Sequence, residues 1–177
     1  EAEIVALRDA DAVVQAVNIA AHFLSYRPRS EQEVRRNLTE KETPAAIIDV
    51  AIERLNGLGY LDDAAFARYW VDNRNQFKPL SHRALRQEMR QKGLSDTVIA
   101  EALGDQSESD LAYKAATTQL RKFRNRTLRE FKTKMNAFLQ RRGFSYSTTQ
   151  DVVARLIETL EADDPDYFNR DDELNED

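Results

Sequence analysis

Helix start signals recur along this chain at intervals of about 50 residues, and such a period is typical of folds built from repeated units. Three residue pairs have the spacing of a capping box, in which each side chain accepts a hydrogen bond from the backbone amide of the other. The pairs are Ser30 and Glu33, Thr127 and Glu130, and Ser147 and Gln150. Thr43 before Pro44, Ser81 and Ser95 supply further starts. Two series result, near residues 30, 81 and 127 and near residues 43, 95 and 147.

Apolar residues and helix stop signals follow the same period. Two apolar residues four positions apart lie on one face of a helix. One such pair occurs in each period: Val34 and Leu38, Leu85 and Met89, and Met135 and Leu139. Lys92-Gly93 and Arg142-Gly143 predict helix ends, because glycine adopts the left-handed conformation that follows a last helical turn. Glu42 stands at the corresponding place in the first period.

Each period also predicts a longer helix before this apolar pair and a third helix after it. The longer helices are expected over residues 12–26, 63–77 and 109–123, and the third helices over 44–58, 96–103 and 148–160. We therefore predict an all-α fold, an elongated array of three tandem three-helix repeats. The predicted boundaries are 1–11 for an N-terminal extension, 12–60, 61–104 and 105–162 for the repeats, and 163–177 for a disordered acidic tail. The alternative is a single compact nine-helix globule with accidental internal similarity.

Composition excludes several classes of site. The 177 residues contain no Cys, which removes disulfides, thiolate metal ligands and a Cys nucleophile. The most apolar stretch, residues 12–24, is short and interrupted by polar side chains, so we expect a soluble, cytoplasmic protein without a membrane span or signal peptide. The sequence also lacks a glycine-rich phosphate loop and a nucleophile elbow.

No set of side chains has the pattern of a catalytic or metal site. His22 and His82 are the only histidines, and we expect His22 to be half-buried in an apolar helix. The adjacent Asp62 and Asp63 are better explained as helix caps than as an acid–base pair. We therefore predict a protein that is not an enzyme and that uses no cofactor and no metal.

Charge is distributed unevenly along the chain. Residues 105–143 contain ten Lys and Arg against four Asp and Glu, whereas residues 163–177 contain eight acids against Arg170. The basic stretch can face DNA phosphates, an acidic protein, the acidic tail or solvent alone. Phe123, Phe131, Phe138 and Phe144 interleave with these charges, and their helical spacing favours core packing over base stacking.

Three segments together resemble the RecX family of recombination regulators. The first is Leu24-Ser25-Tyr26-Arg27-Pro28-Arg29-Ser30-Glu31-Gln32-Glu33-Val34, the second is Gly59-Tyr60-Leu61-Asp62-Asp63-Ala64-Ala65-Phe66-Ala67, and the third is Lys92-Gly93-Leu94. Their order and spacing match the family pattern as well. The resemblance covers about residues 12–160 and is strongest from Leu24 to Leu94. Val34 stands where leucine is usual, and Lys78-Pro79-Leu80 lacks a glycine that the family usually has there.

This resemblance implies a monomeric, non-enzymatic modulator of the RecA recombinase. A family member is expected to bind in the helical groove of the RecA filament on single-stranded DNA. It would thereby inhibit ATP turnover, strand exchange and the repressor cleavage that the filament assists during the SOS response. An extended helical array suits such a groove better than a small-molecule pocket.

Basic side chains are the candidates for contact with the filament or with DNA. They are Arg27, Arg29, Arg74, Arg83, Arg86, Arg90, Arg121, Lys122, Arg124, Arg126, Arg129, Lys132 and Lys134. An alternative function is a helical module that binds single-stranded or duplex DNA directly, without RecA. A further hypothesis is that the acidic tail covers the basic stretch or mimics DNA.

Overall fold

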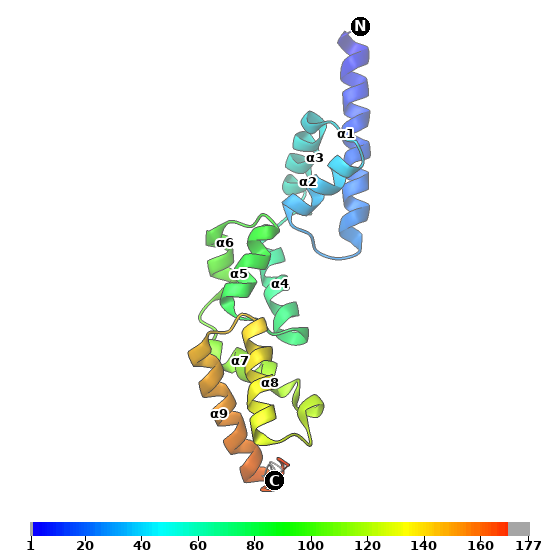
Figure 1. The fold of residues 1–177 in the computed structure, drawn as a ribbon. Coiled ribbons are helices and arrows are strands. Elements are labelled where there is room, and N and C mark those ends of the chain that lie inside the picture. Colours follow the sequence, from blue (N-terminus) through cyan, green and yellow to red (C-terminus); the bar gives the residue numbers. More distant parts are fainter. Residues whose placement is uncertain (1, 170–177) are drawn as a thin grey trace. The chain divides into compact units, whose positions relative to one another are not determined.

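The fold is all-α throughout the part of the chain that the structure describes. The computed structural model describes the backbone of residues 2–169 and the side chains from residue 10 onward. Within that range the chain forms nine α-helices, one short 3-10 helix and no β-strand (Figure 1). This confirms the prediction of an all-α protein made of three tandem groups of three helices.

The helices follow one another in the order that the repeat predicts. They are α1 (Ala2–Ser25), α2 (Glu31–Glu40), α3 (Ala45–Gly57), α4 (Asp63–Phe77), α5 (His82–Gln91), α6 (Asp96–Leu103), α7 (Glu108–Thr117), the 3-10 helix η1 (Leu120–Phe123), α8 (Leu128–Arg141) and α9 (Tyr146–Asp163). Their packing divides the chain into two compact units. Unit 1 consists of Glu1–Val71 and Gln87–Leu103, and unit 2 of Asp72–Arg86 and Gly104–Asp177. The division passes through α4 and α5, so it does not follow the repeats.

The core of unit 1 lies where α1, α2 and α3 pack together. α1 contacts both α2 and α3, and α2 contacts α3. The buried side chains are Ala16 and Ala20 of α1, Val34 and Leu38 of α2, and Ile48, Ala51, Ile52 and Leu55 of α3, with Leu61 after them. Small alanines on α1 let the neighbouring helices approach closely. The predicted pair Val34 and Leu38 is fully buried.

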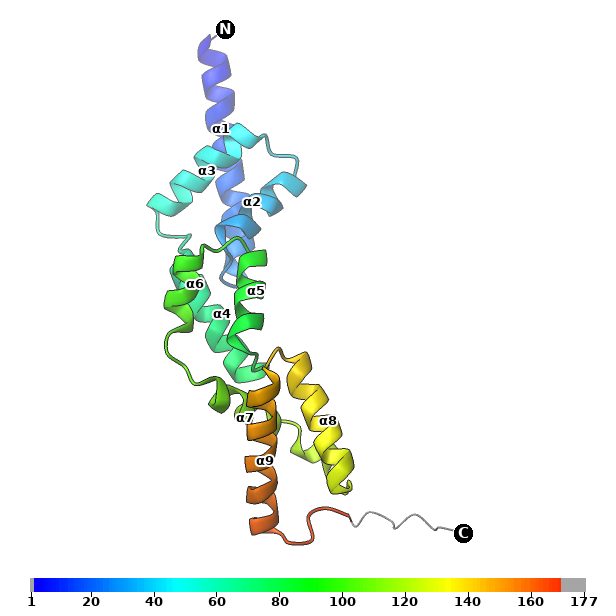
Figure 2. The ribbon, with the colours of Figure 1, turned by 60° about the vertical axis from the view of Figure 1, so that its left-hand side comes forward.

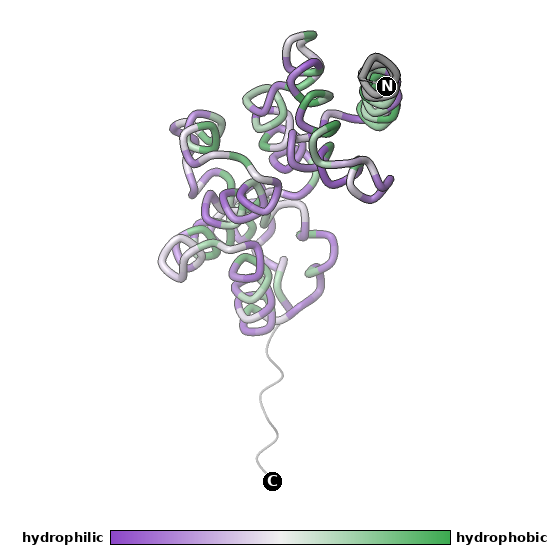
Figure 3. The backbone as a smooth tube through the Cα atoms, turned by 90° about the horizontal axis from the view of Figure 1, so that it is seen from above, coloured by the Kyte–Doolittle hydropathy of each residue, from purple (hydrophilic) through white to green (hydrophobic). Residues whose placement is uncertain are grey.

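Unit 2 has its core between α7, α8 and α9, which lie side by side in Figures 1 and 2. Phe131, Met135 and Leu139 of α8 are fully buried, and Phe138 and Phe144 are also in the core. Phe131, Phe138 and Phe144 therefore pack inside, as their spacing predicts, whereas Phe123 is half-buried against this core. Apolar and polar residues alternate along the helices (Figure 3), a pattern typical of helices with one apolar face.

Residues 164–169 return from the end of α9 to the start of α8. The backbone amide of Asn169 donates to the carbonyl oxygen of Arg126 at 2.9 Å, and the ring of Phe168 lies 5.1 Å from that of Phe131, centroid to centroid. The predicted acidic tail begins within α9 at Asp163 and includes this returning segment, whereas residues 170–177 lie outside the described residues.

Most of the predicted helix starts and stops are present. Ser30 and Thr127 form complete capping boxes, and Ser81 and Ser95 each accept a hydrogen bond from the amide three residues later. Gly93 and Gly143 have φ angles of 82° and 91°, in the left-handed region that their sequence positions predict. Glu42 has a φ of 59° at the matching position, although it carries a side chain.

Several predicted helix boundaries are wrong. α1 begins at Ala2 rather than at residue 12, because residues 2–11 contain no glycine or proline to stop a helix. The cap of α9 is Ser145 and not Ser147. The helix predicted over 109–123 ends at Thr117, and η1 follows it. Pro44 lies at the N-cap of α3 rather than inside its first turn, and Thr43 therefore precedes the cap.

Candidate partner-binding surface

Successive repeats meet where the second helix of one begins and the second helix of the next ends. At the first of these junctions, within unit 1, the Ser30 hydroxyl donates to the carbonyl oxygen of Lys92 at 2.7 Å. The amide of Glu31 donates to an oxygen of Asp63 at 3.0 Å. Gly93 lies so close to Gln32 that an added Cβ would be 2.5 Å from the Gln32 Oε1. The cap of one helix and the stop of another are therefore parts of one contact.

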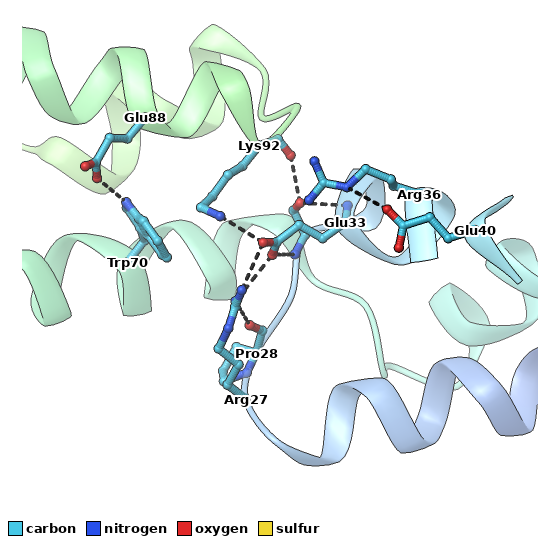
Figure 4. A network of polar contacts seen from close by, with 9 residues as sticks. Arg27, Pro28, Glu33, Arg36, Glu40, Trp70, Glu88 and Lys92 are labelled. Carbon is cyan, nitrogen blue, oxygen red and sulfur yellow. Dashed lines mark hydrogen bonds and ion pairs between the residues drawn. The ribbon is translucent and has the colours of Figure 1, made fainter. Parts of the chain in front are cut away.

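A buried carboxylate holds the first junction together. The Glu33 side chain is 7% exposed and lies between two cations, as Figure 4 shows. Its Oε1 is 3.0 Å from the Arg27 Nη2 and 2.8 Å from the Lys92 Nζ. The ammonium of Lys92 also lies 4.3 Å from the centre of the Trp70 ring, a cation–π contact.

The charge of Glu33 is stabilised by this environment. Burial alone would raise the pKa of Glu33, but hydrogen bonds from Arg27 and Lys92, the charge of Lys92 and the Ser30 amide outweigh it. The pKa of Glu33 is consequently lowered to about 2. Burial also raises the pKa of Asp63, and the nearby charges of Glu31 and Asp62 raise it further, while the hydrogen bond from the Glu31 amide opposes them.

The second junction, within unit 2, repeats much of this arrangement. The amide of Ser81 donates to the carbonyl oxygen of Arg142 at 3.1 Å, and the amide of His82 donates to Glu108 at 2.7 Å. An added Cβ on Gly143 would be 2.5 Å from the Ser81 hydroxyl and 2.9 Å from the Ala84 Cβ. Glycine is therefore required at this junction for two reasons, its φ angle and its close contact with α5.

The two junctions differ in their charges. Glu33 stands three residues after Ser30, and the residue three after Ser81 is Ala84. Lys92 corresponds to Arg142, whose Nη1 is buried and has no hydrogen-bond partner among the residues that the structure describes. The pKa of Arg142 is lowered by burial and then by the positive charges of Arg141 and Arg74.

The candidate arginines of the first motif are partly used inside unit 1. Arg27 pairs with Glu33 and also donates to the Pro28 carbonyl oxygen at 2.8 Å. The guanidinium of Arg29 lies 4.1 Å from the centre of the Phe23 ring. Burial and the charge of Arg27 lower the pKa of Arg29, although the charges of Glu33 and Tyr69 oppose them.

A hollow of about 560 Å³ lies beside these arginines. It is lined in part by Leu24, Tyr26, Pro28, Tyr60 and Phe66. Tyr26 is 71% exposed and Tyr60 is 59% exposed, so two aromatic rings are accessible there. The turn at Gly59 predicts that Tyr60 and Leu61 both pack back on the core, and this is wrong for Tyr60, because only Leu61 is buried.

The other candidate arginines belong to both units. Arg90 of unit 1 is exposed and forms an ion pair with Asp96 at 2.7 Å. In unit 2, Arg83 is exposed and donates to the Gly143 carbonyl oxygen at 3.3 Å, and Arg86 is exposed on the same helix. Arg74 is half-buried and lies near enough to Arg142 to lower its pKa.

The basic residues of the third repeat lie mainly on its surface. Five of them are exposed: Arg121, Lys122, Arg124, Arg129 and Lys132. Arg126 and Lys134 are half-buried, and Arg126 approaches Glu130 at 3.5 Å. Arg129 and Lys132 line an open hollow of about 430 Å³ at the start of α8 together with Leu128 and Thr133.

The predictions for histidine and paired aspartates have separate outcomes. His22 is exposed rather than half-buried, and its Nε2 is 3.1 Å from the Tyr26 hydroxyl. Asp62 is the cap of α4, since it accepts a hydrogen bond from the Ala65 amide. Asp63 instead contacts the first junction. Among the described residues, no three His, Asp or Glu side chains are grouped as a metal site would require.

Sequence reasoning did not identify three of the junction residues as interacting groups. Glu33 was identified only as part of a capping box. Lys92 and Arg142 were identified only as the residues that precede a glycine. The available signal for Lys92 and Arg142 was their nearly constant spacing of 62 and 61 residues from Ser30 and Ser81, whereas no repeated signal marked Glu33, because Ala84 stands at its place in the next period. In the described part of the chain, no helix is long and apolar enough to cross a membrane.

Comparison with known families agrees with the repeat. Residues 16–55 match the first three-helix domain of RecX, residues 62–103 the second and residues 106–153 the third. The chain is 35% identical over 162 residues to a regulatory protein RecX from Bacillus subtilis (strain 168). It is 32% identical over 142 residues to one from Pelodictyon phaeoclathratiforme, and this match covers 80% of the chain and 89% of the relative.

Solved structures give the same result for the fold. A crystal structure of regulatory protein RecX matches with a TM-score of 0.72 and 29% identity, and the match covers 86% of this chain and 76% of the other. The crystal structure of RecX from Lactobacillus salivarius matches with a TM-score of 0.69 and 22% identity, covering 84% of this chain and 99% of the other. The match to the B. subtilis relative covers 90% of this chain but only 60% of that relative.

Proposed function

The chain belongs to the RecX family of regulatory proteins, and from this premise we propose that it is a non-enzymatic regulator of homologous recombination and of the SOS response. In this proposal it acts in the cytoplasm as a monomer and binds in the groove of the RecA filament on single-stranded DNA. Binding there inhibits ATP turnover, strand exchange and repressor cleavage.

The observation that carries this proposal is the match of all three repeats to the three RecX domains in the same order. The fold supports it, because tandem repeats provide a large surface for a macromolecular partner. Exposed arginines in both units add charge for an acidic protein surface or for DNA.

A RecA ATPase assay tests the proposal directly. RecA filaments are formed on single-stranded DNA, and the full chain is titrated in at constant salt. We expect ATP hydrolysis to fall and to reach a plateau as the filament becomes saturated. Undiminished hydrolysis, measured while sedimentation shows that the chain is bound to the filaments, would contradict inhibition. Absence of the chain from the sedimented filaments would contradict binding.

Direct DNA binding is a second candidate function, and the surface of the third repeat favours it. Arg121, Lys122, Arg124, Arg129 and Lys132 are all exposed on one short part of the chain. Basic side chains that contact phosphates release counterions, so such binding weakens steeply as salt rises. A salt titration of binding to single-stranded DNA without RecA separates the two functions. Strong salt-dependent binding supports the DNA module, and binding only to preformed filaments supports the RecA regulator.

A further inference from the structure

At the second junction, basic residues stand at the register positions of the two cations of the first, but no acid stands at the position of its carboxylate. Lys78 and Arg142 occupy the register positions of Arg27 and Lys92, whereas Ala84 occupies that of Glu33. The amides of His82 and Glu31 make equivalent hydrogen bonds to a carboxylate, and a residue at the start of α5 bonds to the carbonyl oxygen before Gly143, as one at the start of α2 does before Gly93. The donor differs, since Ser81 uses its backbone amide and Ser30 its hydroxyl. The two sites therefore join the same parts of the repeat, and the carboxylate of the first is missing from the second.

The missing acid leaves Arg142 incompletely satisfied. Its Nη1 is buried without a hydrogen-bond partner, and no carboxylate of the described residues forms an ion pair with it. Glu108, the acid present at this junction, is engaged by the amide of His82. A buried N–H donor of a charged group raises the free energy of the protein when it has no acceptor. An acceptor supplied to Arg142 should therefore contribute more binding free energy than one supplied to an ordinary surface arginine.

Nearby positive charge increases the preference for an anion. Arg83 donates to the Gly143 carbonyl oxygen, which places a second guanidinium beside the junction. Arg141 and Arg74 both act electrostatically on Arg142. Arg142 as a whole is half-buried, and its guanidinium lies 5.0 Å from the centre of the Phe138 ring, a contact that supplies no hydrogen-bond acceptor in the ring plane.

We propose that the second junction binds a side-chain carboxylate of an acidic protein segment, in the place that Glu33 fills at the first junction. The first junction is the reason for choosing a carboxylate, because it shows this group bound between the corresponding cations at 2.8 Å and 3.0 Å. The proposal rests on the proposed function for the source of the acid, which is then a subunit of the RecA filament.

Glycine amides provide an internal reporter for each junction. The chain has five glycines, of which Gly93 belongs to the first junction and Gly143 to the second. We would titrate the isotope-labelled full chain with blocked tetraglutamate at constant ionic strength and follow both amide signals by NMR. The expected result is a saturable shift of the Gly143 signal, with little change at Gly93 because Glu33 already occupies that site.

Two variants test whether the missing acid is responsible. Ala84→Glu places a carboxylate at the register position of Glu33, and Arg142→Gln removes the cation. Each is expected to weaken the Gly143 response about tenfold or more, the effect of losing one charge-assisted hydrogen bond. Thermal melting of each variant checks that it is folded, and Arg142→Gln decides the result if the longer side chain at 84 does not fit under Gly143.

The possible outcomes are distinct. No shift at Gly143, equal shifts at both glycines, or an unchanged response in folded variants would overturn the proposal. A response to oligothymidylate of matched charge but not to tetraglutamate would also overturn it, in favour of a phosphate site. In the RecA ATPase assay, Ala84→Glu should inhibit less than the unaltered chain. If the unaltered chain does not inhibit, the proposed function fails while the peptide titration still decides the site.

Discussion

Replacing Glu33 by glutamine removes the buried charge of the first junction while keeping the size of the side chain. The gap between the ordinary pKa of 4.5 and the folded value of about 2 corresponds to about 3 kcal/mol, since each pH unit is worth about 1.4 kcal/mol. Glutamine still offers an oxygen to the Ser30 amide, so the expected loss at pH 7 is about 2–3 kcal/mol.

The pH dependence follows from the direction of the pKa change. The folded pKa of Glu33 is below the unfolded one, so the unfolded chain binds more protons between them. The stabilisation is therefore complete above about pH 4.5 and is lost as the pH falls towards 2. Glu33→Gln should remove this component, and the difference in unfolding free energy between the two proteins should shrink over the same range.

Urea unfolding followed by Trp70 fluorescence measures this effect. Trp70 is the only tryptophan and lies against Lys92 within unit 1, so its emission reports on the affected unit. Glu40→Gln is the matched control, because Glu40 is on the same helix, is well exposed and is 4.0 Å from Arg36. A loss below about 0.5 kcal/mol for Glu33→Gln, or an unchanged pH dependence, would refute the reasoning.

Three further changes test the other contacts. Gly143→Ala should destabilise the protein by about 2–4 kcal/mol in urea unfolding, because the added methyl group meets α5 and the φ angle of residue 143 is positive. The control Gly57→Ala, with open space around residue 57, should be neutral or slightly stabilising. Ser30→Ala should cost about 1–2 kcal/mol and more than the exposed cap variant Ser107→Ala, a ranking that thermal melting checks. Arg90→Ala should leave the melting temperature unchanged, since its ion pair is solvent-exposed; a clear decrease would contradict this.

Local sequence signals predicted the helices well where caps and stops were strong. The Ser30 and Thr127 capping boxes and the left-handed Gly93 and Gly143 depend on residues a few positions apart, so the sequence alone was sufficient. The predictions failed where competing signals were close together, as at Ser145 and Ser147, where the earlier serine is the cap. Ser147 has the Gln150 of a capping box, but α9 begins at Tyr146, and the hydroxyl of Ser145 accepts from the Thr148 amide.

The sequence by itself determined the class of fold, the threefold repeat and the family, because all three are expressed in the order and spacing of residues along the chain. Only the tertiary structure showed that the cap of one repeat bonds to the stop of the next, as Ser30 does to Lys92 across 62 positions. It also decided that Glu33 is a buried ion partner and that Arg142 has no ion pair with an acid of the described residues. Such roles depend on which residues, distant in the sequence, are buried together, because charges interact most strongly where water is excluded.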